Sequence, residues 1–220
     1  MSYKLSKSSL GLMEECRRCF WLDKHKVWKR PSTPFPQLPN GMDRVLKIHF
    51  DKFMKKGELP PEICNHNHCE NMKLFDNEEL LNQWRNVRKY GINWKDKEGN
   101  LFFGGVDNIM VKGKNLIVLD YKTKGSALKD ENIASEGYQN QLDSYNFLLR
   151  KKGYSTEDYG FLLFYYPKEV LETGEVIFDT TLVKRKINVT NAEKLFEKAL
   201  ELLSEECPIK CCIWCEGRYE

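Results

Sequence analysis

The sequence predicts an α/β protein, because helical periodicity gives way to strand periodicity partway along the chain and the two kinds of element then alternate. Residues 1–90 form a helical N-terminal part. Residues 94–205 form the predicted core. It contains, in this order, a hairpin, a helix, two strands and a last helix. This order favours helices packed on a sheet over a helical bundle or a barrel. The 220 residues, 41% of them hydrophobic and 30% charged, are enough for a single domain over residues 1–220.

The N-terminal part contains three predicted helices and one proline-rich segment. The helices are expected at residues 10–25, capped by Ser6 or Ser8, at residues 42–57, and from Asn77 to residue 91. Four prolines occur between residues 31 and 41, which we therefore expect to form an extended linker.

The predicted core begins with a β-hairpin. The hairpin consists of strands at residues 101–111 and 115–123 around the turn "KGKN". A helix at 131–152, ended by Gly153, and strands at 159–167 and 175–187 come next. A capping box of Thr190 and Glu193 begins the last helix. A cysteine-rich tail, residues 206–220, follows.

Each strand of the predicted hairpin contains an aspartate in an apolar setting. Asp107 lies in "GGVDNIMV", and Asp120 ends the run "LIVL". A buried carboxylate is costly unless a cation or several hydrogen bonds hold it. Two such groups on paired strands would form an oxygen-rich site suited to Mg²⁺ or Mn²⁺. Lys122 leaves the strand on the same face as Asp120 and is placed to stabilise charge on a phosphate.

The helix that follows the hairpin adds two polar residues on one face. Gln141 and Tyr145 are four positions apart and so lie one turn from each other. Taken alone they fit an ordinary amphipathic helix; after the aspartates and Lys122 they are candidate site residues.

The succession "GGVD", "VLDYK" and "YQNQLDSY" resembles the PD-(D/E)XK nuclease superfamily, in its RecB-like branch that includes CRISPR-associated exonucleases. The resemblance implies a restriction-endonuclease-like core, a mixed central sheet flanked by helices. It implies that Asp107, Asp120 and the backbone carbonyl of Tyr121 bind the metal, and that Lys122 is catalytic. It also implies that Gln141 and Tyr145 position the substrate or a water molecule.

The family often adds a histidine on a helix as a further metal ligand. His49, in "VLKIHFDKF", is the candidate, although the spacing from Gly41 departs from the usual pattern. Lys47 or Asp51 could face the site in its place.

Two C-x-x-C pairs lie at opposite ends of the chain, Cys16 with Cys19 and Cys212 with Cys215. If the termini meet, these four thiolates would bind Zn²⁺ or a [4Fe–4S] cluster and join the ends as a staple. RecB-like nucleases resemble this plan, because several tie an N-terminal cysteine to C-terminal ones through an iron–sulfur cluster.

Other cysteines leave alternatives to this ligand set. Cys207 or Cys211 could replace Cys19, because the commonest family pattern has one N-terminal and three C-terminal cysteines. The segment "CNHNHC", residues 64–69, could bind zinc by itself, but its ligands are too close together for all to join one site, so we expect a solvated loop.

The resemblance implies DNA as the substrate. Basic segments such as "KTKG" and "LLRKKG", with Tyr and Trp side chains, would suit single-stranded DNA or DNA ends. The sequence thus predicts a Mg²⁺- or Mn²⁺-dependent DNA exonuclease in repair, recombination or CRISPR-type processing. A noncatalytic DNA-binding scaffold subunit is the alternative. A stand-alone zinc or redox protein would leave the hairpin acids unexplained.

The chain contains no phosphate-binding loop of a helicase, so unwinding would need a helicase or another nucleic-acid-processing partner. No stretch approaches the ~18 apolar residues of a membrane helix, and the first residues contain no signal-peptide core. These observations predict a cytoplasmic protein with no membrane contact.

Overall fold

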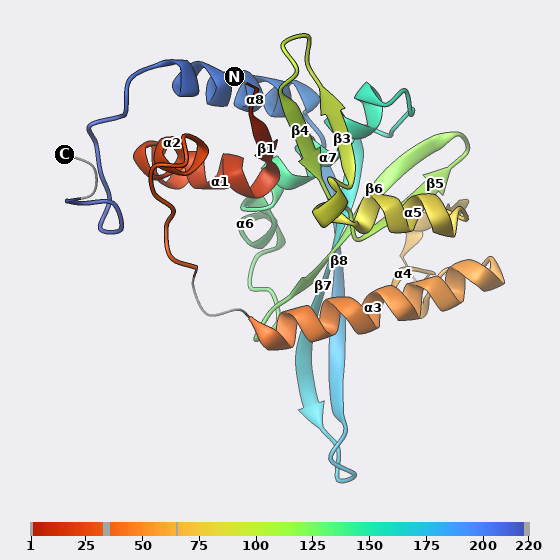
Figure 1. The fold of residues 1–220 in the computed structure, drawn as a ribbon. Helices are drawn as coiled ribbons and strands as arrows, with labels where there is room; N and C mark the ends of the chain where they lie inside the picture. The colour runs from red at the N-terminus through yellow and green to blue at the C-terminus, as the bar shows by residue number, and fades with distance from the viewer. Residues whose placement is uncertain (1, 33–35, 65, 218–220) are drawn as a thin grey trace.

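The computed structural model describes residues 2–32, 36–64 and 66–217 (Figure 1). Its larger sheet has the strand order β2-β5-β6-β7-β8, in which β6 and β7 are parallel and the other neighbours antiparallel. The strands are β2 (Met72–Leu74), β5 (Asn108–Lys112), β6 (Asn115–Thr123), β7 (Tyr159–Val170) and β8 (Val176–Lys186). The predicted α/β class, with a mixed sheet flanked by helices, is confirmed.

A second sheet has the order β1-β4-β3, formed by β1 (Lys4–Ser6), β4 (Leu101–Gly104) and β3 (Ile92–Lys95). The prediction of one strand over residues 101–111 is therefore wrong, because β4 and β5 belong to different sheets. The chain leaves β4 at two glycines that have no room for side chains: a Cβ on Gly105 would lie 2.3 Å from Val87 Cγ2. The hairpin of β5 and β6 is confirmed, with Gly113 at φ +59° in its turn.

The first predicted helix is two helices, α1 (Lys7–Glu15) and α2 (Arg17–Lys24). Cys16 separates them in an extended conformation (φ −157°, ψ 108°), and its Sγ caps α2 by accepting from the Cys19 amide. Ser6 caps α1 through a reciprocal pair of bonds with Ser9, which decides between the two predicted caps. The break turns Cys16 toward the C-terminal tail.

Helix α3 (Gln37–Lys56) begins five residues before the predicted start, so the linker prediction is wrong for residues 37–41. Proline is tolerated there, because Pro39 lies in the first helical turn, where amide groups have no partner within the helix. Residues 33–35 of the predicted linker lie outside the described part of the chain. The α3 helix crosses one face of the larger sheet (Figure 1), and the ring of Phe50 packs 4.7 Å from that of Tyr121 on β6.

The helix predicted over residues 131–152 is also divided, into α6 (Glu131–Glu136) and α7 (Gln139–Lys151), at Gly137 and Tyr138. The predicted capping box of α8 (Val189–Ser204) is wrong, because Asn188 is the cap and accepts from the Asn191 amide at 3.3 Å.

The other helices are α4 (Pro61–Cys64), α5 (Glu78–Arg85), capped by Asn77 as predicted, and the 3-10 helices η1 (Asn67–Cys69) and η2 (Val87–Lys89).

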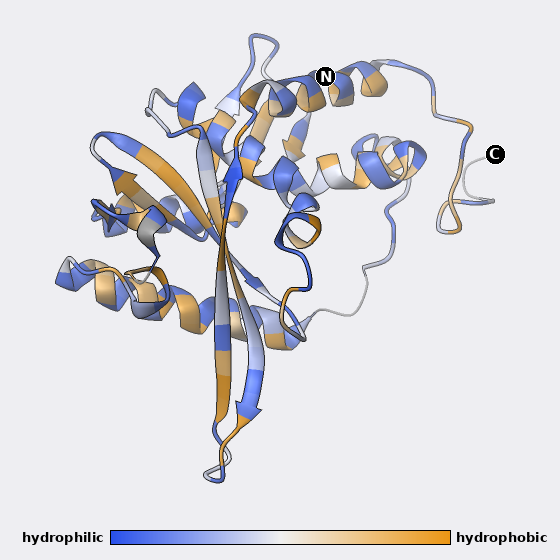
Figure 2. Ribbon diagram, turned by 180° about the vertical axis from the view of Figure 1, so that it is seen from behind, coloured by the Kyte–Doolittle hydropathy of each residue, from blue (hydrophilic) through white to orange (hydrophobic). Residues whose placement is uncertain are grey.

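Helix α7 lies inside the fold, with residues 141–149 all buried between the two sheets. Phe147 packs against Phe102 of β4 at 5.8 Å between ring centroids, and Phe102 in turn stacks on Phe196 of α8 at 5.2 Å. Strands β7 and β8 project past α3 as a two-stranded arm that mixes hydrophilic and hydrophobic residues (Figure 2). Among the described helices, none is both long enough and apolar enough to cross a membrane.

Candidate active site and metal centre

Asp120 and Lys122 lie on β6, an interior strand of the larger sheet, and their side chains point toward α7. The Asp120 side chain is 1% exposed and that of Lys122 is 14% exposed. The Lys122 ammonium contacts the Asp120 carboxylate directly. Tyr121, between them, faces the opposite side, where it packs on α3. Strand alternation therefore brings the acid and the base to one face, as the sequence predicts.

Asp107 lies between β4 and β5, outside either strand, and reaches β6 across the sheet. Its Oδ2 accepts a hydrogen bond from the Tyr121 amide at 2.9 Å, and its Oδ1 lies 3.1 Å from Lys47 Nζ. The backbone carbonyl of Asp107 accepts from Arg85 Nε at 2.8 Å, and Arg85 is itself held by Asp51 at 2.9 Å. Contacts from β6 and α3 thus fix the carboxylate beside Asp120, and α5 holds the backbone of the same residue.

Asp107 is close enough to Asp120 to affect the ionisation of Asp120. Burial first, and then the negative charge of Asp107, raise the pKa of Asp120 to about 7. Burial lowers the pKa of Lys122, but the charges of Asp120 and Asp107 outweigh burial and raise it overall. Two adjacent carboxyl groups, one of them buried, repel each other when both are ionised, and a divalent cation between them would remove that repulsion.

Gln141 and Tyr145 complete a hydrogen-bonded row along α7. Gln141 Nε2 donates to Asp120 Oδ1 at 2.7 Å and to the Tyr145 hydroxyl at 3.0 Å, while its Oε1 accepts from Lys122 at 3.2 Å. The structure therefore brings together the four predicted residues Asp120, Lys122, Gln141 and Tyr145. Gly104 of the "GGVD" motif has a role in this packing: a Cβ there would lie 2.6 Å from Cε1 of Tyr145.

A cavity of about 260 Å³ opens beside Lys122. Its lining residues come from α3, β6 and the break between α6 and α7: Pro39, Asp43, Leu46, Tyr121, Lys122, Thr123 and Tyr138. The Lys122 ammonium lies 4.6 Å from the centre of the Tyr138 ring, which also has Lys124 within 5.5 Å. An aromatic ring and the Lys122 ammonium thus border the opening next to the carboxylates, and Lys124 lies against the same ring.

In the structure His49 pairs with Glu62 and not with Asp107 or Asp120, and its role as a metal ligand stays a prediction. His49 Nε2 lies 2.9 Å from Glu62, on the side of α3 that faces α4. Lys47, two positions earlier, contacts Asp107 instead. Successive helical residues are ~100° apart, so side chains two positions apart leave the helix in nearly opposite directions. Of the residues weighed in place of His49, Lys47 faces the carboxylate and Asp51 acts through Arg85.

Several residues of the site carry no motif that sequence reasoning can use. Arg85 reaches Asp107 from α5, and Asn108 donates to the Tyr121 hydroxyl at 2.8 Å. Both are polar residues near the ends of elements, and their partners come from elsewhere in the fold: the loop before β5 for Arg85 and β6 for Asn108. For Tyr121, its amide binds Asp107, while a metal-binding role of its carbonyl stays a prediction.

The four predicted cysteines meet where α2 lies beside the C-terminal tail (Figure 1). The Sγ–Sγ distances are 3.8 Å for Cys16 and Cys215, 3.6 Å for Cys19 and Cys212, and 3.8 Å for Cys212 and Cys215. All four sulfur atoms lie within 4.8 Å of one another. The predicted four-cysteine staple between the two ends of the chain is confirmed as a cluster able to bind a metal.

The spacing of the sulfur atoms fits a single tetrahedral ion. Four thiolates bound at about 2.3 Å to one Zn²⁺ have their sulfurs about 3.8 Å apart. A [4Fe–4S] cluster binds each thiolate at a different iron, so the same four sulfurs would have to move apart.

Nonligand residues complete the cysteine cluster. Arg30 NH2 lies 3.6 Å from Cys19 Sγ and 3.7 Å from Cys212 Sγ, and its NH1 pairs with Glu15 at 2.6 Å. A guanidinium there offsets thiolate charge, which is how residues around a metal site commonly support its ligands.

The remaining cysteines lie outside this group. Among the described residues, the cysteines that come together with metal-binding spacing are Cys16, Cys19, Cys212 and Cys215. Cys207 and Cys211 are therefore not substitutes for Cys19. Cys64 is exposed and Cys69 buried, and the described part of the segment 64–69 forms no further metal-binding group.

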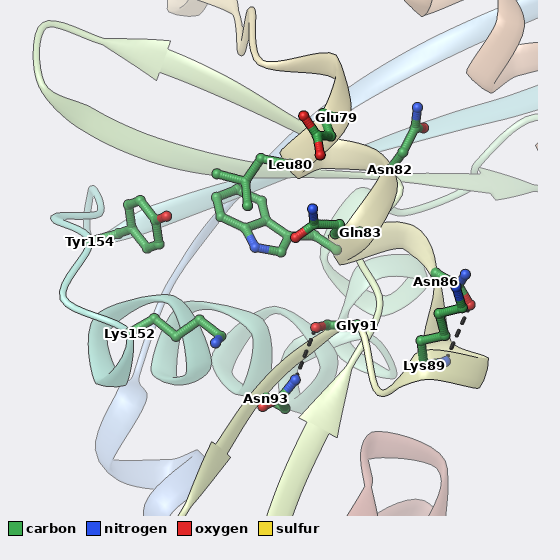
Figure 3. A pocket seen from close by; sticks show the side chains of 11 residues that line it. Glu79, Leu80, Asn82, Gln83, Asn86, Lys89, Gly91, Asn93, Lys152 and Tyr154 are labelled. Carbon is green, nitrogen blue, oxygen red and sulfur yellow. Dashed lines mark hydrogen bonds between the residues drawn. The ribbon is translucent and has the colours of Figure 1, made fainter.

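A larger cavity of about 660 Å³ lies away from both sites (Figure 3). It is lined by Glu79, Leu80, Asn82, Gln83, Trp84, Asn86, Lys89, Gly91, Asn93, Lys152 and Tyr154. Side-chain amides in its lining bond to nearby backbone groups; for example, Asn93 Nδ2 donates to the Gly91 carbonyl at 3.2 Å (Figure 3). None of the predicted site residues lines this cavity.

No family model and no curated protein matches this sequence. Among solved structures, the chain is similar to one described as the crystal structure of SSO0001. The two are 14% identical with a TM-score of 0.42, and the similarity covers 95% of this chain and 87% of the other.

Proposed function

We propose that the protein is a Mg²⁺- or Mn²⁺-dependent deoxyribonuclease of the PD-(D/E)XK type, with a restriction-endonuclease-like core. The observation that carries this proposal is the hydrogen-bonded group formed by Asp120, Lys122 and Gln141 beside the fixed carboxylate of Asp107. The order of these residues in the chain and their placement on a hairpin and the next helix agree with the motifs of that superfamily.

The donor set suits a hard divalent cation. Asp107 and Asp120 would hold it with carboxylate oxygens, and the raised pKa of Asp120 reflects burial and a negative neighbour that a cation would offset. When bound, such an ion activates water and neutralises charge on the scissile phosphate. In this structure Lys47 and Lys122 are the cations that contact the two carboxylates.

The other residues position groups around the carboxylates. Lys122, with its raised pKa, stays protonated at neutral pH and presents an ammonium to charge that develops on the phosphate. Gln141 holds both Asp120 and Lys122 in place through its two amide atoms. Burial and the nearby aspartates raise the pKa of Tyr145 well above its usual value, so its hydroxyl remains neutral beside Gln141.

The border of the cavity beside Lys122 favours a single strand of DNA or a DNA end. Tyr138 offers an aromatic face for a base, and Lys122 and Lys124 offer positive charge for the backbone. These features read no base sequence, so they support an exonuclease better than a site-specific endonuclease. A helicase partner would supply unwound strands.

The four cysteines would hold a metal with a structural role, linking α2 to the tail. The sulfur spacing supports Zn²⁺, and a [4Fe–4S] cluster is the alternative. Metal analysis and the visible absorbance of anaerobically purified protein distinguish them. Stoichiometric zinc without visible absorbance supports zinc, and iron with sulfide supports the cluster.

The nuclease proposal is tested with end-labelled single- and double-stranded DNA in Mg²⁺ or Mn²⁺. We expect wild type to cut, and the near-isosteric variants Asp120→Asn and Lys122→Met to lose on the order of 100-fold or more in rate. Matched controls are Asp179→Asn and Lys114→Met, whose side chains are exposed far from the site and whose rates should equal wild type.

Three outcomes separate the candidates. Cleavage that the two site variants abolish and the controls retain supports the nuclease. Tight DNA binding by wild type without cleavage in either metal supports the noncatalytic scaffold. Equal cleavage by wild type and both site variants would falsify the assignment of this site.

A further inference from the structure

A cavity of about 430 Å³ lies between α1 and the start of α7. Residues of α1, the α6–α7 break, α7 and α8 line it: Lys7, Leu10, Gly11, Glu14, Glu15, Gly137, Asn140, Ser144 and Leu195. A Cβ added at Gly11 or Gly137 would meet no atom within 4 Å, so the cavity is open at both glycines.

This cavity adjoins the proposed active site. Gly137 immediately precedes Tyr138, which lines the cavity beside Lys122. Asn140 immediately precedes Gln141, which binds Asp120 and Lys122. The α6–α7 break therefore borders both cavities.

Lys7 is the positive group of this cavity and is half-buried. Among the residues that the structure describes, none forms a hydrogen bond or ion pair with its ammonium. Burial first, and then the positive charge of Lys122, lower its pKa, while Asp120 and Glu14 offset part of this effect. A half-buried cation beside a second cation is unfavourable, and an anion placed between them would stabilise both.

The acidic residues of the cavity have their own partners. Both carboxylate oxygens of Glu14 accept from Asn140 Nδ2, at 2.8 and 2.9 Å, and Glu15 pairs with Arg30 at 2.6 Å. Neither forms an ion pair with Lys7. The Lys7 ammonium is thus left without a carboxylate partner among the described residues.

From this arrangement we infer that Lys7 binds a backbone phosphate of the DNA strand, next to the phosphate that lies at Lys122. The inference rests on the proposed nuclease function and extends it: the substrate path continues from the Lys122 cavity across Tyr138 to α1. Lys7 is then a substrate-binding residue supplied by α1, the helix that precedes the cysteine-bearing α2.

The test measures binding of a fluorescent single-stranded oligonucleotide in EDTA, which prevents cleavage, over a series of salt concentrations. We expect Lys7→Gln to weaken binding about tenfold at low salt and to reduce the slope of log K against log salt by about 0.7, the contribution of one phosphate contact on single strands. Lys7→Arg should retain most of the affinity. Lys114→Gln, an exposed lysine in the β5–β6 turn, is the matched control and should behave as wild type.

A second pair of variants tests the cavity without changing charge. Gly11→Phe should fill it and weaken binding, whereas Gly11→Ala should leave affinity unchanged and raise helix stability, because alanine favours a helix interior by about 1 kcal/mol over glycine. This pair keeps the inference testable if Lys7→Gln does not fold.

The outcomes separate this inference from the function on which it rests. If wild type cuts and binds DNA, and Lys7→Gln and Gly11→Phe match it in affinity and salt slope, the Lys7 site is wrong and the nuclease stands. If wild type neither binds nor cuts DNA, both proposals fail. Weaker binding by both variants, with the two controls unchanged, supports the site.

Discussion

The backbone amide of Tyr121 donates a hydrogen bond to Asp107 Oδ2 at 2.9 Å, and this bond fixes the carboxylate beside Asp120. Through it, the strand that carries the second acid positions the first, which lies in a turn. Asp107→Asn keeps an oxygen able to accept this bond but removes the charge. We expect a roughly 100-fold or greater loss of metal-dependent cleavage with a small change in melting temperature. Asp107→Ala should lose the same activity and also melt lower; unchanged cleavage by the asparagine variant would contradict a ligand role.

Gly104 and Tyr145 are coupled by close packing. A Cβ at Gly104 would lie 2.6 Å from the Tyr145 ring, so Gly104→Ala should displace that ring and cost about 1–3 kcal/mol of unfolding free energy. In Gly104→Ala/Tyr145→Leu the smaller side chain leaves room, and the cost should be less than the sum of the two single changes. Denaturant unfolding of wild type, the two single variants and the double variant measures this coupling. If the stability losses of the single variants simply add in the double variant, the Tyr145 ring is not what excludes a side chain at residue 104.

The cysteine cluster joins residues that are 199 positions apart, Cys16 and Cys215. Cys215→Ser should abolish metal binding at this site and lower the melting temperature by roughly 5–10 °C, or about 2–3 kcal/mol, because the link between the ends of the chain is lost. Cys211→Ser is the matched control: Cys211 is exposed and outside the cluster, so metal content and melting temperature should stay at wild-type values. Metal loss in the control would show that the ligand set is different.

Asp143 and Asp120 are both buried carboxylates, but their surroundings predict opposite responses to asparagine. Asp143 accepts from the Asn188 amide at 2.8 Å, Gln139 Nε2 at 2.7 Å and Asn191 Nδ2 at 2.8 Å, and no cation of the described residues forms an ion pair with it. Asp143→Asn places an amide against one of these donors, so we expect a loss of about 1–3 kcal/mol in stability with normal cleavage per folded molecule.

Asp120→Asn should do the reverse, with cleavage lost and stability retained, because repulsion from Asp107 disappears. Thermal melting and initial rates on the same preparations provide the comparison. If Asp143→Asn and Asp120→Asn change stability and cleavage rate to the same extent, the two carboxylates do not have the different roles assigned to them.

Lys47 and His49 lie two positions apart on α3, and we expect their substitution to affect the metal dependence of cleavage differently. Lys47 contacts Asp107 at 3.1 Å, whereas His49 pairs with Glu62 at 2.9 Å. We expect His49→Ala to leave the metal dependence of cleavage unchanged and Lys47→Met to shift the concentration of Mn²⁺ needed for half-maximal rate. A His49→Ala variant that needs much more metal would restore the histidine as a ligand.

Local sequence patterns predicted the elements that neighbouring residues control. The β5–β6 hairpin was predictable because apolar runs flank a short glycine-containing turn, and Gly113 indeed has a positive φ. Strand alternation likewise placed Asp120 and Lys122 on one face. The C-x-x-C spacing identified the cysteines that meet.

Predictions failed where a distant contact determines the conformation. Cys16 breaks the first helix and turns toward Cys215, although helical periodicity continues through it. Gly104 and Gly105 end β4 because side chains of other elements occupy the adjacent space, which removes Asp107 from the strand.

The sequence by itself determined the α/β class, the order of Asp107, Asp120, Lys122 and Gln141, and the pairing of cysteines at the two ends. Only the tertiary structure decided that Lys47 faces Asp107 while His49 pairs with Glu62. Periodicity and turn preferences depend on residues a few positions apart. The face that a helix presents to a partner depends on the packing of whole elements, which local patterns do not encode.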